Sequence, residues 1–213
     1  MIGPVLNHGT LMSIIIFTYL VQRLLGMQVK NLEMAAHDII EIAPEETSEA
    51  FPSFFLKNDL QKITGLAPYT NWGIIKERLF CGIVTHSSTK VLQFNSSIIR
   101  GGYKYTSRTC YPVNTKHHKH ERQGLDERVL NPVLASTEGG NTWFGHWITD
   151  DLTLHLAAEK LGTPVVVPRP EYAHEVGYRQ LLDVEGRYIK GGKLKNLTIL
   201  QDFFTEQLQK TEI

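Results

Sequence analysis

A chain of 213 residues is long enough for one full hydrophobic core or two smaller ones. Its 42% apolar and 21% charged residues are typical of a globular protein and exclude a disordered one. Because 22 basic residues balance 22 acidic residues, no net field favours a polyanion, and we expect no nucleic-acid partner. The two cysteines, Cys81 and Cys110, lie far apart and outside any metal-ligand spacing, which favours a reduced, cytoplasmic setting.

The first part of the chain carries an apolar stretch, Leu11 to Leu25. It is shorter than the ~20 residues that span a bilayer, and it lacks the basic start and the small-residue cleavage site of a signal peptide. Its apolar residues recur at helical spacing, so residues 1–28 are predicted to form an N-terminal helix and extension. Three interpretations stay open for the helix: it packs on the core, it forms an interface, or it lies on a membrane surface. Met12 is an alternative start.

Between this helix and the middle of the chain we expect a small antiparallel β part. The acidic, proline-bounded segment Glu45–Pro52 is predicted to be a loop. The pair Gly101 and Gly102 separates two β-like runs, a pattern that predicts a hairpin. Alternating or β-branched runs predict short strands at Leu79–Thr85, Lys90–Asn95, Ser97–Ile99 and Tyr103–Thr106.

Residues 116–122, with the sequence KHHKHER, place several histidines close together. Adjacent side chains diverge, and no usual zinc ligand set is completed nearby. We therefore interpret this segment as a solvated loop.

The centre of the chain is predicted to be a βαβ unit. Val129–Ala135 is predicted as a strand that Pro132 moves to a sheet edge or a bulge. A flexible turn over Gly139 to Asn141 leads into an amphipathic helix, and Gly162 is expected to close that helix in the left-handed conformation. The apolar run Val165 to Val167 is typical of a buried strand. Ligands of open α/β sheets bind at the carboxyl ends of strands, so we expect a site at the turn before the helix.

Beyond this unit the sequence predicts a second helix over Pro170–Asp183, with Pro170 near its start. Short strands are predicted at Arg187–Ile189 and Leu197–Leu200, and one more helix begins at Phe203. The order of these elements indicates an α/β fold class.

The segment GGNTWFGHWITDDL, followed by LAAEKLGTPVVVP, resembles the glycosyltransferase 61 family, whose bacterial members are often described as capsular polysaccharide biosynthesis proteins. At this place the family has an asparagine-rich turn, an aromatic residue, His-Trp, a variable pair and an acid. Residues 35–60 resemble the family's IAP-x-E segment, and residues 91–105 resemble its glycine-paired hairpin. The resemblance covers most of residues 29–185.

The resemblance implies a GT-B enzyme, in which two Rossmann-like domains face a cleft and the second mainly holds the nucleotide-sugar. Family members continue into a glycine-rich segment near HGAGL, which this sequence lacks. Residues 29–213 are therefore expected to be the Rossmann-like acceptor-side domain, with the second domain largely absent. The chain is then expected to be a truncated enzyme or one whose second domain comes from a partner chain.

The same resemblance implies transfer of a sugar from a nucleotide-sugar to a polysaccharide or glycan acceptor, with His146 as the base for the acceptor hydroxyl. His146 and Asp150 are four residues apart, so on a helix they share a face and the acid orients the imidazole. The expected substrate-binding residues, which stack on sugar rings or bind polar groups, are Asn141, Thr142, Trp143, Trp147 and Asp151. No Asp-x-Asp pair is present, so we expect no metal and no cofactor beyond the nucleotide-sugar donor.

Structural interpretations stand beside these roles. His146 and Asp150 also fit a helix start that is capped and complemented at its dipole, and the two tryptophans also fit a core. Arg169 and Arg179 can reach a phosphate, although we interpret them as solvated surface residues. The alternative function is a non-catalytic acceptor-binding or regulatory remnant of such an enzyme. Peripheral membrane contact through residues 11–25 of a cytoplasmic protein stays open.

Overall fold

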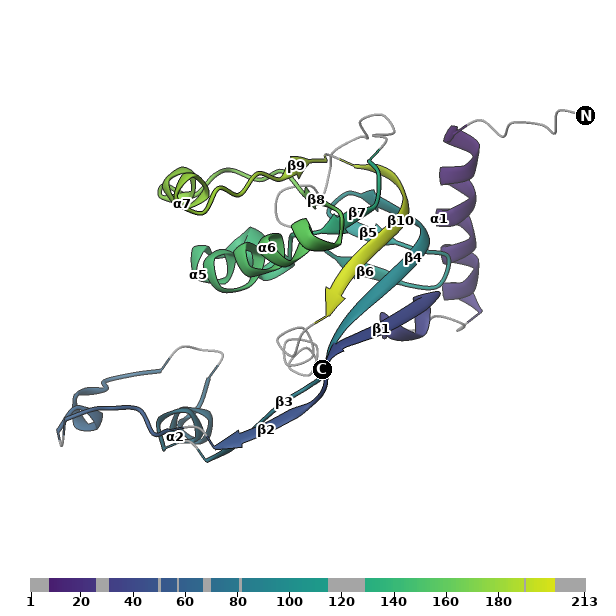
Figure 1. The fold of residues 1–213 in the computed structure, drawn as a ribbon. Coiled ribbons are helices and arrows are strands. Elements are labelled where there is room, and N and C mark those ends of the chain that lie inside the picture. Colours follow the sequence, from purple (N-terminus) through teal and green to yellow (C-terminus); the bar gives the residue numbers. More distant parts are fainter. Residues whose placement is uncertain are drawn as a thin grey trace, which may run out of the picture. The chain divides into compact units, whose positions relative to one another are not determined.

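Figure 1 shows a computed structural model of the chain. The structure describes residues 8–25, 31–49, 51–56, 58–66, 70–80, 82–114, 129–189 and 191–201. The histidine-rich segment 116–122, Cys81 and the helix predicted from Phe203 lie outside the described residues. The chain divides into two compact units, Met1–Ile40 with Lys90–Gln201 and Glu41–Thr89 with Asp202–Ile213.

The larger unit is built on an eight-stranded mixed sheet. Seven strands follow the order β6-β5-β4-β10-β7-β8-β9, and β1 pairs with β4 beside this path. Strands β10, β7, β8 and β9 run parallel to one another, whereas β4, β5 and β6 continue the sheet antiparallel. The strands are β1 Asp38–Ala43, β4 Thr89–Arg100, β5 Tyr103–Tyr105, β6 Cys110–Pro112, β7 Pro132–Leu134, β8 Thr163–Val166, β9 Arg187–Tyr188 and β10 Gly192–Gln201. The chain is therefore a mixed α/β protein, as the order of predicted elements indicates.

The hairpin predicted at the paired glycines is confirmed. Strands β4 and β5 pair antiparallel, with Arg100 opposite Tyr103. Gly101 and Gly102 between them have φ angles of 56° and 80°, in the region that favours glycine.

Strand β7 differs from its prediction in both length and position. The predicted position at a sheet edge is wrong, because β7 lies between β10 and β8 inside the sheet. Pro132 is the first residue of the strand, a position where proline is tolerated inside a sheet.

The connection from β7 to β8 is helical over almost its whole length. It contains α4 Glu138–Thr142, α5 Phe144–His146, the π-helix η3 Trp147–Asp151 and α6 Leu152–Leu161. The predicted flexible turn over Gly139 to Asn141 is wrong, since these residues are buried within α4. The hydroxyl of Thr137 accepts a hydrogen bond from the Gly140 N–H and so caps α4. A capped helix thus replaces the expected loop.

Gly162 follows α6, but the predicted left-handed conformation is wrong. Its φ of 169° is extended backbone. A Cβ atom at this position would overlap the carbonyl oxygen of Asn131. The glycine is therefore explained by close packing of the helix end against the start of β7.

The connection from β8 to β9 contains a shorter helix than predicted. Helix α7 is Glu175–Leu182, so Pro170 does not lie at its start. Two prolines, Pro168 and Pro170, lie between β8 and α7, and proline disfavours a helical conformation of the residue before it. This non-helical segment brings Arg169 and Tyr172 toward the end of β8, as described below.

The sheet of the larger unit has a hydrophobic core on each face. Val133 of β7 and Val166 of β8 pack with Ala158 of α6, whereas their neighbours Leu134 and Val165 belong to a second cluster. Successive strand residues point to opposite faces, so the two clusters lie on opposite sides of the sheet. Figure 1 accordingly shows α5, α6 and α7 on one side of the sheet and α1 on the other.

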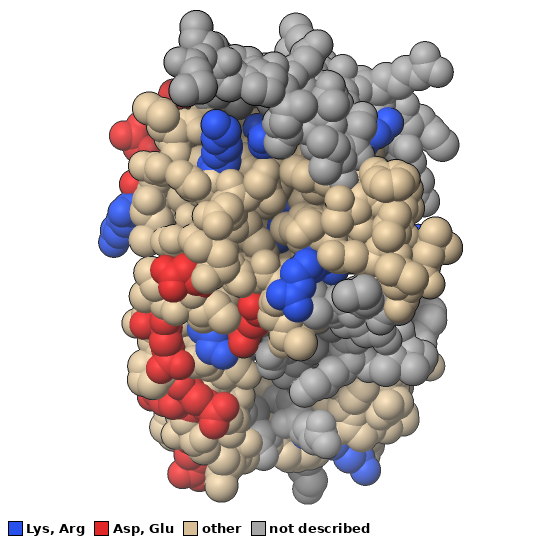
Figure 2. All heavy atoms as spheres, turned by 90° about the vertical axis from the view of Figure 1, so that its right-hand side faces the viewer, with Lys and Arg blue, Asp and Glu red and all other residues tan. Residues whose placement is uncertain are grey.

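Helix α1, His8–Leu24, confirms the predicted N-terminal helix. Tyr19 packs edge-on against Tyr105 of β5, with ring centroids 5.5 Å apart. On the outward side, Phe17, Leu20 and Leu24 are exposed. Figure 2 views this side, where much of the described surface is neither acidic nor basic. Among the residues that the structure describes, no helix is long and apolar enough to cross a membrane.

Strand β5 of the larger unit carries a buried lysine, Lys104. Its side chain is fully buried, and its Nζ lies 3.3 Å from the ring centroid of Phe94. Burial lowers the pKa of Lys104 to about 7.

The smaller unit contains β2 Glu46–Glu49, η2 Leu60–Lys62, α2 Trp72–Phe80 and β3 Ile83–His86. The loop predicted over Glu45–Pro52 is wrong in part, because β2 pairs antiparallel with β3 within it. Helix α2 also takes Leu79 and Phe80 out of the predicted strand. A short helix η1 Glu33–Ala35 precedes β1 in the larger unit.

Candidate functional site

A pocket lies where β7, β8 and β9 end. Its lining includes Ser136 after β7, Val167 after β8 and Tyr188 at the end of β9. The carboxyl ends of parallel strands meet at this edge, which is where ligands of open α/β sheets bind. The pocket therefore occupies the edge of the sheet where the sequence predicts a site.

The structure divides the predicted site residues between two places. Asn141, Trp147 and Asp151 line the pocket. His146 and Asp150 form a pair outside its lining, with Trp143 against the imidazole ring at a centroid distance of 5.6 Å. Thr142 is also outside the lining.

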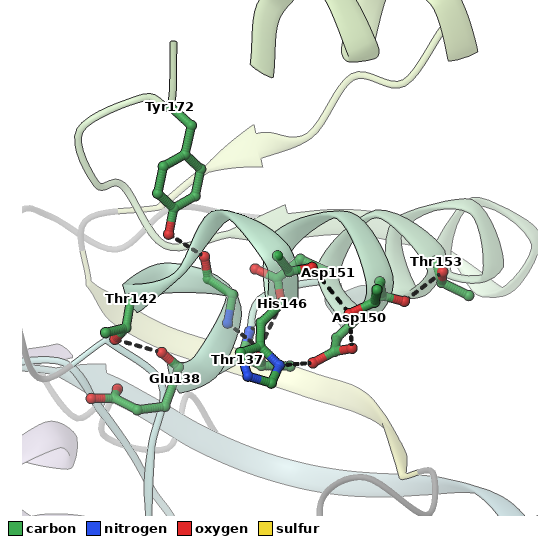
Figure 3. A network of polar contacts seen from close by, with 11 residues as sticks. Thr137, Glu138, Thr142, His146, Asp150, Asp151, Thr153 and Tyr172 are labelled. Atoms are coloured by element: carbon green, nitrogen blue, oxygen red, sulfur yellow. Dashed lines mark hydrogen bonds and ion pairs between the residues drawn. The ribbon is translucent and has the colours of Figure 1, made fainter. Parts of the chain in front are cut away.

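The predicted contact between His146 and Asp150 is present. His146 Nδ1 and Asp150 Oδ2 are 2.9 Å apart, and the side chains are 36% and 10% exposed. The Thr149 hydroxyl donates to the other oxygen of Asp150 at 2.5 Å. Figure 3 shows the two side chains together beside the helix, while Tyr172 approaches from the other side. With Nδ1–H donating to Asp150, Nε2 of the partly exposed ring keeps its lone pair for a proton.

Asp151 has different surroundings from its neighbour. Its Oδ1 accepts from the backbone N–H of Thr137 at 2.9 Å and from the Thr137 hydroxyl at 2.7 Å. Burial raises the pKa of Asp151 to about 7, against the lowering effect of these two hydrogen bonds. A carboxyl group that titrates near neutral pH can both give and take a proton.

Close packing explains the glycine at position 140 of the motif. A Cβ on Gly140 would overlap the Asp151 carboxylate, so only glycine lets that carboxylate reach Thr137. The Gly140 carbonyl also accepts a hydrogen bond of 2.9 Å from the Tyr172 hydroxyl. Gly140 is thus positioned between Asp151 and Tyr172.

The polar groups of Asn141 and Thr142 are engaged within the protein. Asn141 Nδ2 donates to the carbonyl oxygens of Val113 and Thr137 at 2.7 and 2.8 Å. The Thr142 hydroxyl donates to the carbonyl of Glu138 at 2.8 Å. The bond to Val113 ties α4 to the segment after β6, and the three bonds together account for both residue types without a substrate.

The two tryptophans have separate surroundings. Trp147 is buried and packs with Leu152, Val184 and Tyr172, while Trp143 is 58% exposed beside His146. Trp147 is therefore a core residue that also forms a pocket wall. Trp143 presents an aromatic face to solvent next to the histidine.

The π-helix η3 carries Trp147, Asp150 and Asp151, whose side chains have different surroundings. It spans Trp147–Asp151 and lies between α5 and α6. A π-turn inserts an extra residue into the helical repeat, and such turns are frequent at functional sites. The sequence carries no signal for it.

Four charged residues of the pocket lining are missing from the predicted site, namely Arg169, Glu171, Glu175 and Arg179. Glu175 is buried and pairs with Arg169 at 2.8 Å and with Arg179 at 2.8 Å. The interpretation of the two arginines as solvated surface residues is wrong, because their side chains are 6% and 17% exposed. Glu175 and Arg179 are four residues apart on a helix, a spacing that could have indicated the pair. Arg169 has no such sequence signal.

A further histidine near the site, His155, fits a structural role. His155 is buried in α6, and its Nε2 is 2.9 Å from the carbonyl oxygen of Glu185. Burial lowers the pKa of His155, which favours its neutral form. Within the described residues, no cluster of three or more histidine, cysteine or acidic side chains is placed to hold a metal ion.

The geometry defines a mixed α/β protein with a polar, aromatic-walled pocket at the carboxyl ends of parallel strands. Compared with protein-family models, with curated proteins and with solved structures, the chain matches none of them.

Proposed function

We propose that the protein is a glycosyltransferase that moves a sugar from a nucleotide-sugar to a polysaccharide or glycan acceptor. The observation that carries the proposal is the contact of 2.9 Å between His146 and Asp150 at the motif that resembles the glycosyltransferase 61 family. In this reaction the acceptor hydroxyl gives its proton to Nε2 of His146. The hydroxyl oxygen then bonds to the anomeric carbon as the nucleoside diphosphate leaves.

Several features around the pair support this proposal. Asp150 holds the ring orientation and stabilises the imidazolium that forms when the proton arrives. Trp143 offers an exposed face on which a sugar ring can stack beside the imidazole. In the pocket, Asp151 is a second candidate acid or base, because its pKa of about 7 lets it exchange a proton near neutral pH.

The GT-B architecture belongs to the same proposal. Two successive βαβ connections with parallel strands support a Rossmann-like acceptor-side domain. In such an architecture the nucleotide-sugar is held mainly by a second Rossmann-like domain. No metal enters the proposed reaction.

The second candidate function is a non-catalytic acceptor-binding or regulatory module. The observation that favours it is the separation of His146 and Asp150 from the pocket lining. A pocket that binds a sugar without bringing it to the histidine would bind the acceptor and transfer nothing.

The test measures sugar transfer from a set of nucleotide-sugars to glycan acceptors, with the chain alone and with candidate partner proteins. We expect transfer that His146→Ala lowers at least about 100-fold, within the range of general base catalysis. His174→Ala is the matched control, since this exposed histidine lies outside the pair. Unchanged turnover in His146→Ala removes the histidine from the mechanism, and acceptor binding without transfer favours the second candidate.

Peripheral membrane contact through residues 11–25 is a separate part of the proposal. The exposed side chains Phe17, Leu20 and Leu24 form one apolar stripe of α1, and Arg23 adds a positive charge near its end. Sedimentation with anionic lipid vesicles tests it. We expect binding that Phe17→Ser with Leu24→Ser abolishes, and a chain that stays in the supernatant contradicts this part alone.

A further inference from the structure

Two guanidinium groups converge on the pocket from different segments. Arg169 comes from the connection after β8, and Arg179 comes from α7. Their side chains are largely buried, and both bind the carboxylate of Glu175. Arg179 uses Nη2 at 2.8 Å and Nε at 2.9 Å, whereas Arg169 uses Nη1 at 2.8 Å.

Aromatic rings hold the planes of both guanidinium groups. The Cζ atom of Arg169 lies 4.1 Å from the ring centroid of Tyr172. The Cζ atom of Arg179 lies 5.5 Å from the ring of Trp147 and 6.0 Å from that of Tyr188. Such stacking fixes the direction of the remaining N–H groups, so the donors are in place before a ligand arrives.

The buried charges of the pocket do not balance. One buried carboxylate, that of Glu175, serves two arginines. Asp151 makes its hydrogen bonds with Thr137, and its raised pKa keeps a large fraction of it neutral near pH 7. The other titratable groups of the pocket lining are His155, whose pKa is lowered, Tyr188, whose pKa is raised, and the exposed Glu171. Tyr172, whose pKa is also raised, lies beside the pocket against Arg169. Of the charged groups buried at the pocket, two guanidinium groups therefore stand against Glu175 and a partly neutral Asp151, while the exposed Glu171 adds a negative charge to the lining.

The arginines also have unused donors. Within the part of the chain that the structure describes, Nε and Nη2 of Arg169 and Nη1 of Arg179 have no protein partner. Arg169 Nη1 additionally donates to the carbonyl of Pro170 at 2.8 Å. Guanidinium N–H groups in a fixed plane bind carboxylate or phosphate oxygens by two parallel hydrogen bonds.

We infer that the pocket binds a sugar through a carboxylate or phosphate group on that sugar, held by Arg169 and Arg179. The enclosed space of the pocket is about that of one water molecule, so only the anionic group enters it. The sugar ring stays at the mouth, against the partly exposed ring of Tyr188. The inference rests on the proposed function only in that the ligand is a sugar. It narrows the glycan that the protein binds to one that carries an acidic sugar, such as a uronic acid or a sugar phosphate.

The test is a calorimetric titration of the full chain at low salt with glucuronate, glucose 6-phosphate and neutral glucose. We expect an acidic sugar to bind at least about 10-fold more tightly than glucose, and the tighter of the two acidic sugars identifies carboxylate or phosphate as the group. Arg179→Met leaves Arg169 and Glu175 as a balanced pair, so we expect a folded chain whose affinity for the acidic sugar is at least about 10-fold weaker. The matched control is Arg108→Met, which removes an exposed positive charge on the β5–β6 turn and leaves the affinity unchanged.

If Arg179→Met does not fold, Arg179→Lys keeps the charge and loses the planar fork, and we then expect a several-fold loss of affinity. Equal binding of glucose and the acidic sugars overturns the inference, as does an unchanged affinity in the folded Arg179 variant. These outcomes are separate from those of the transfer assay. Transfer to neutral acceptors without binding of acidic sugars supports the proposed function and overturns the inference. Binding of acidic sugars without transfer supports the inference and overturns the proposed function.

Discussion

Asp150 and Asp151 are neighbours in the sequence, yet they occupy two very different sides of the same helix. Asp150, whose side chain is only 10% exposed, contacts a partly exposed histidine and a threonine hydroxyl. Asp151 lies in the buried pocket wall, where it accepts two hydrogen bonds from Thr137. The π-turn that contains both carboxylates sends each to its own partners.

The comparison shows that environment gives identical side chains different properties. Burial raises the pKa of Asp151 against the lowering effects of the Thr137 hydrogen bonds and of Arg169, and close packing around Asp151 requires glycine at position 140. The side chain of His146, on the other, open side of the helix, is 36% exposed and is less tightly enclosed. We therefore expect substitutions on the pocket side to change stability strongly and substitutions on the open side to change it little.

The largest effect is expected for Gly140→Ala on the pocket side. The added Cβ overlaps the Asp151 carboxylate, which is buried and cannot move to solvent. We expect the free energy of unfolding to fall by about 3 kcal/mol, the upper part of the range for overpacking a core. Urea denaturation measures it.

Gly145→Ala is the matched control for this substitution. Gly145 is an exposed helical glycine, and a Cβ there meets no atom within 4 Å. Alanine favours the helix over glycine, so this variant should be unchanged or more stable by up to about 1 kcal/mol. Equal stability of the two variants would contradict the packing of Gly140 against Asp151.

A smaller effect is expected from Asp151→Asn, and it depends on pH. The pKa of Asp151 is about 7 in the folded protein, raised from its ordinary value of 3.8. Between these values the folded state holds a proton that the unfolded state has lost, so stability falls as pH rises. We expect this group to lower the stability of the wild type by about 2 kcal/mol from pH 5 to pH 6.5.

The asparagine variant lacks this titration, so the difference between the two proteins isolates it. Lys104 has a lowered pKa of about 7, and below pH 6.5 it is mostly protonated in both states. Its contribution is the same in both proteins. Urea denaturation at several pH values measures the slopes, and parallel slopes for the wild type and Asp151→Asn would show that Asp151 ionises normally. Asp150→Asn serves as the neighbouring control.

The sequence predicts the parts of this site that depend on local spacing. His146 and Asp150 meet because residues four apart share a helix face, and the hairpin forms because paired glycines accept positive φ. The pocket side could not be predicted in this way. Glu175 and Arg169 meet through tertiary packing of a proline-containing connection, and Gly140 is set by contact with a residue in another helix. Glycines within a motif indicate a turn and close packing equally well, and only the structure distinguishes these two reasons.

The smallest effect on stability is expected on the open side, from breaking the contact between His146 and Asp150. A partly exposed ion pair or hydrogen bond contributes about 1 kcal/mol or less, and salt screens it further. A double-mutant cycle with His146→Ala and Asp150→Ala, measured by urea denaturation, should give a coupling energy within that limit. A coupling of several kcal/mol would mean that the pair holds the fold together, and the loss of transfer in His146→Ala would then report unfolding. A small coupling together with a large loss of transfer instead separates chemistry from stability, because a side chain that contributes little to the fold can then affect the rate only through the reaction itself.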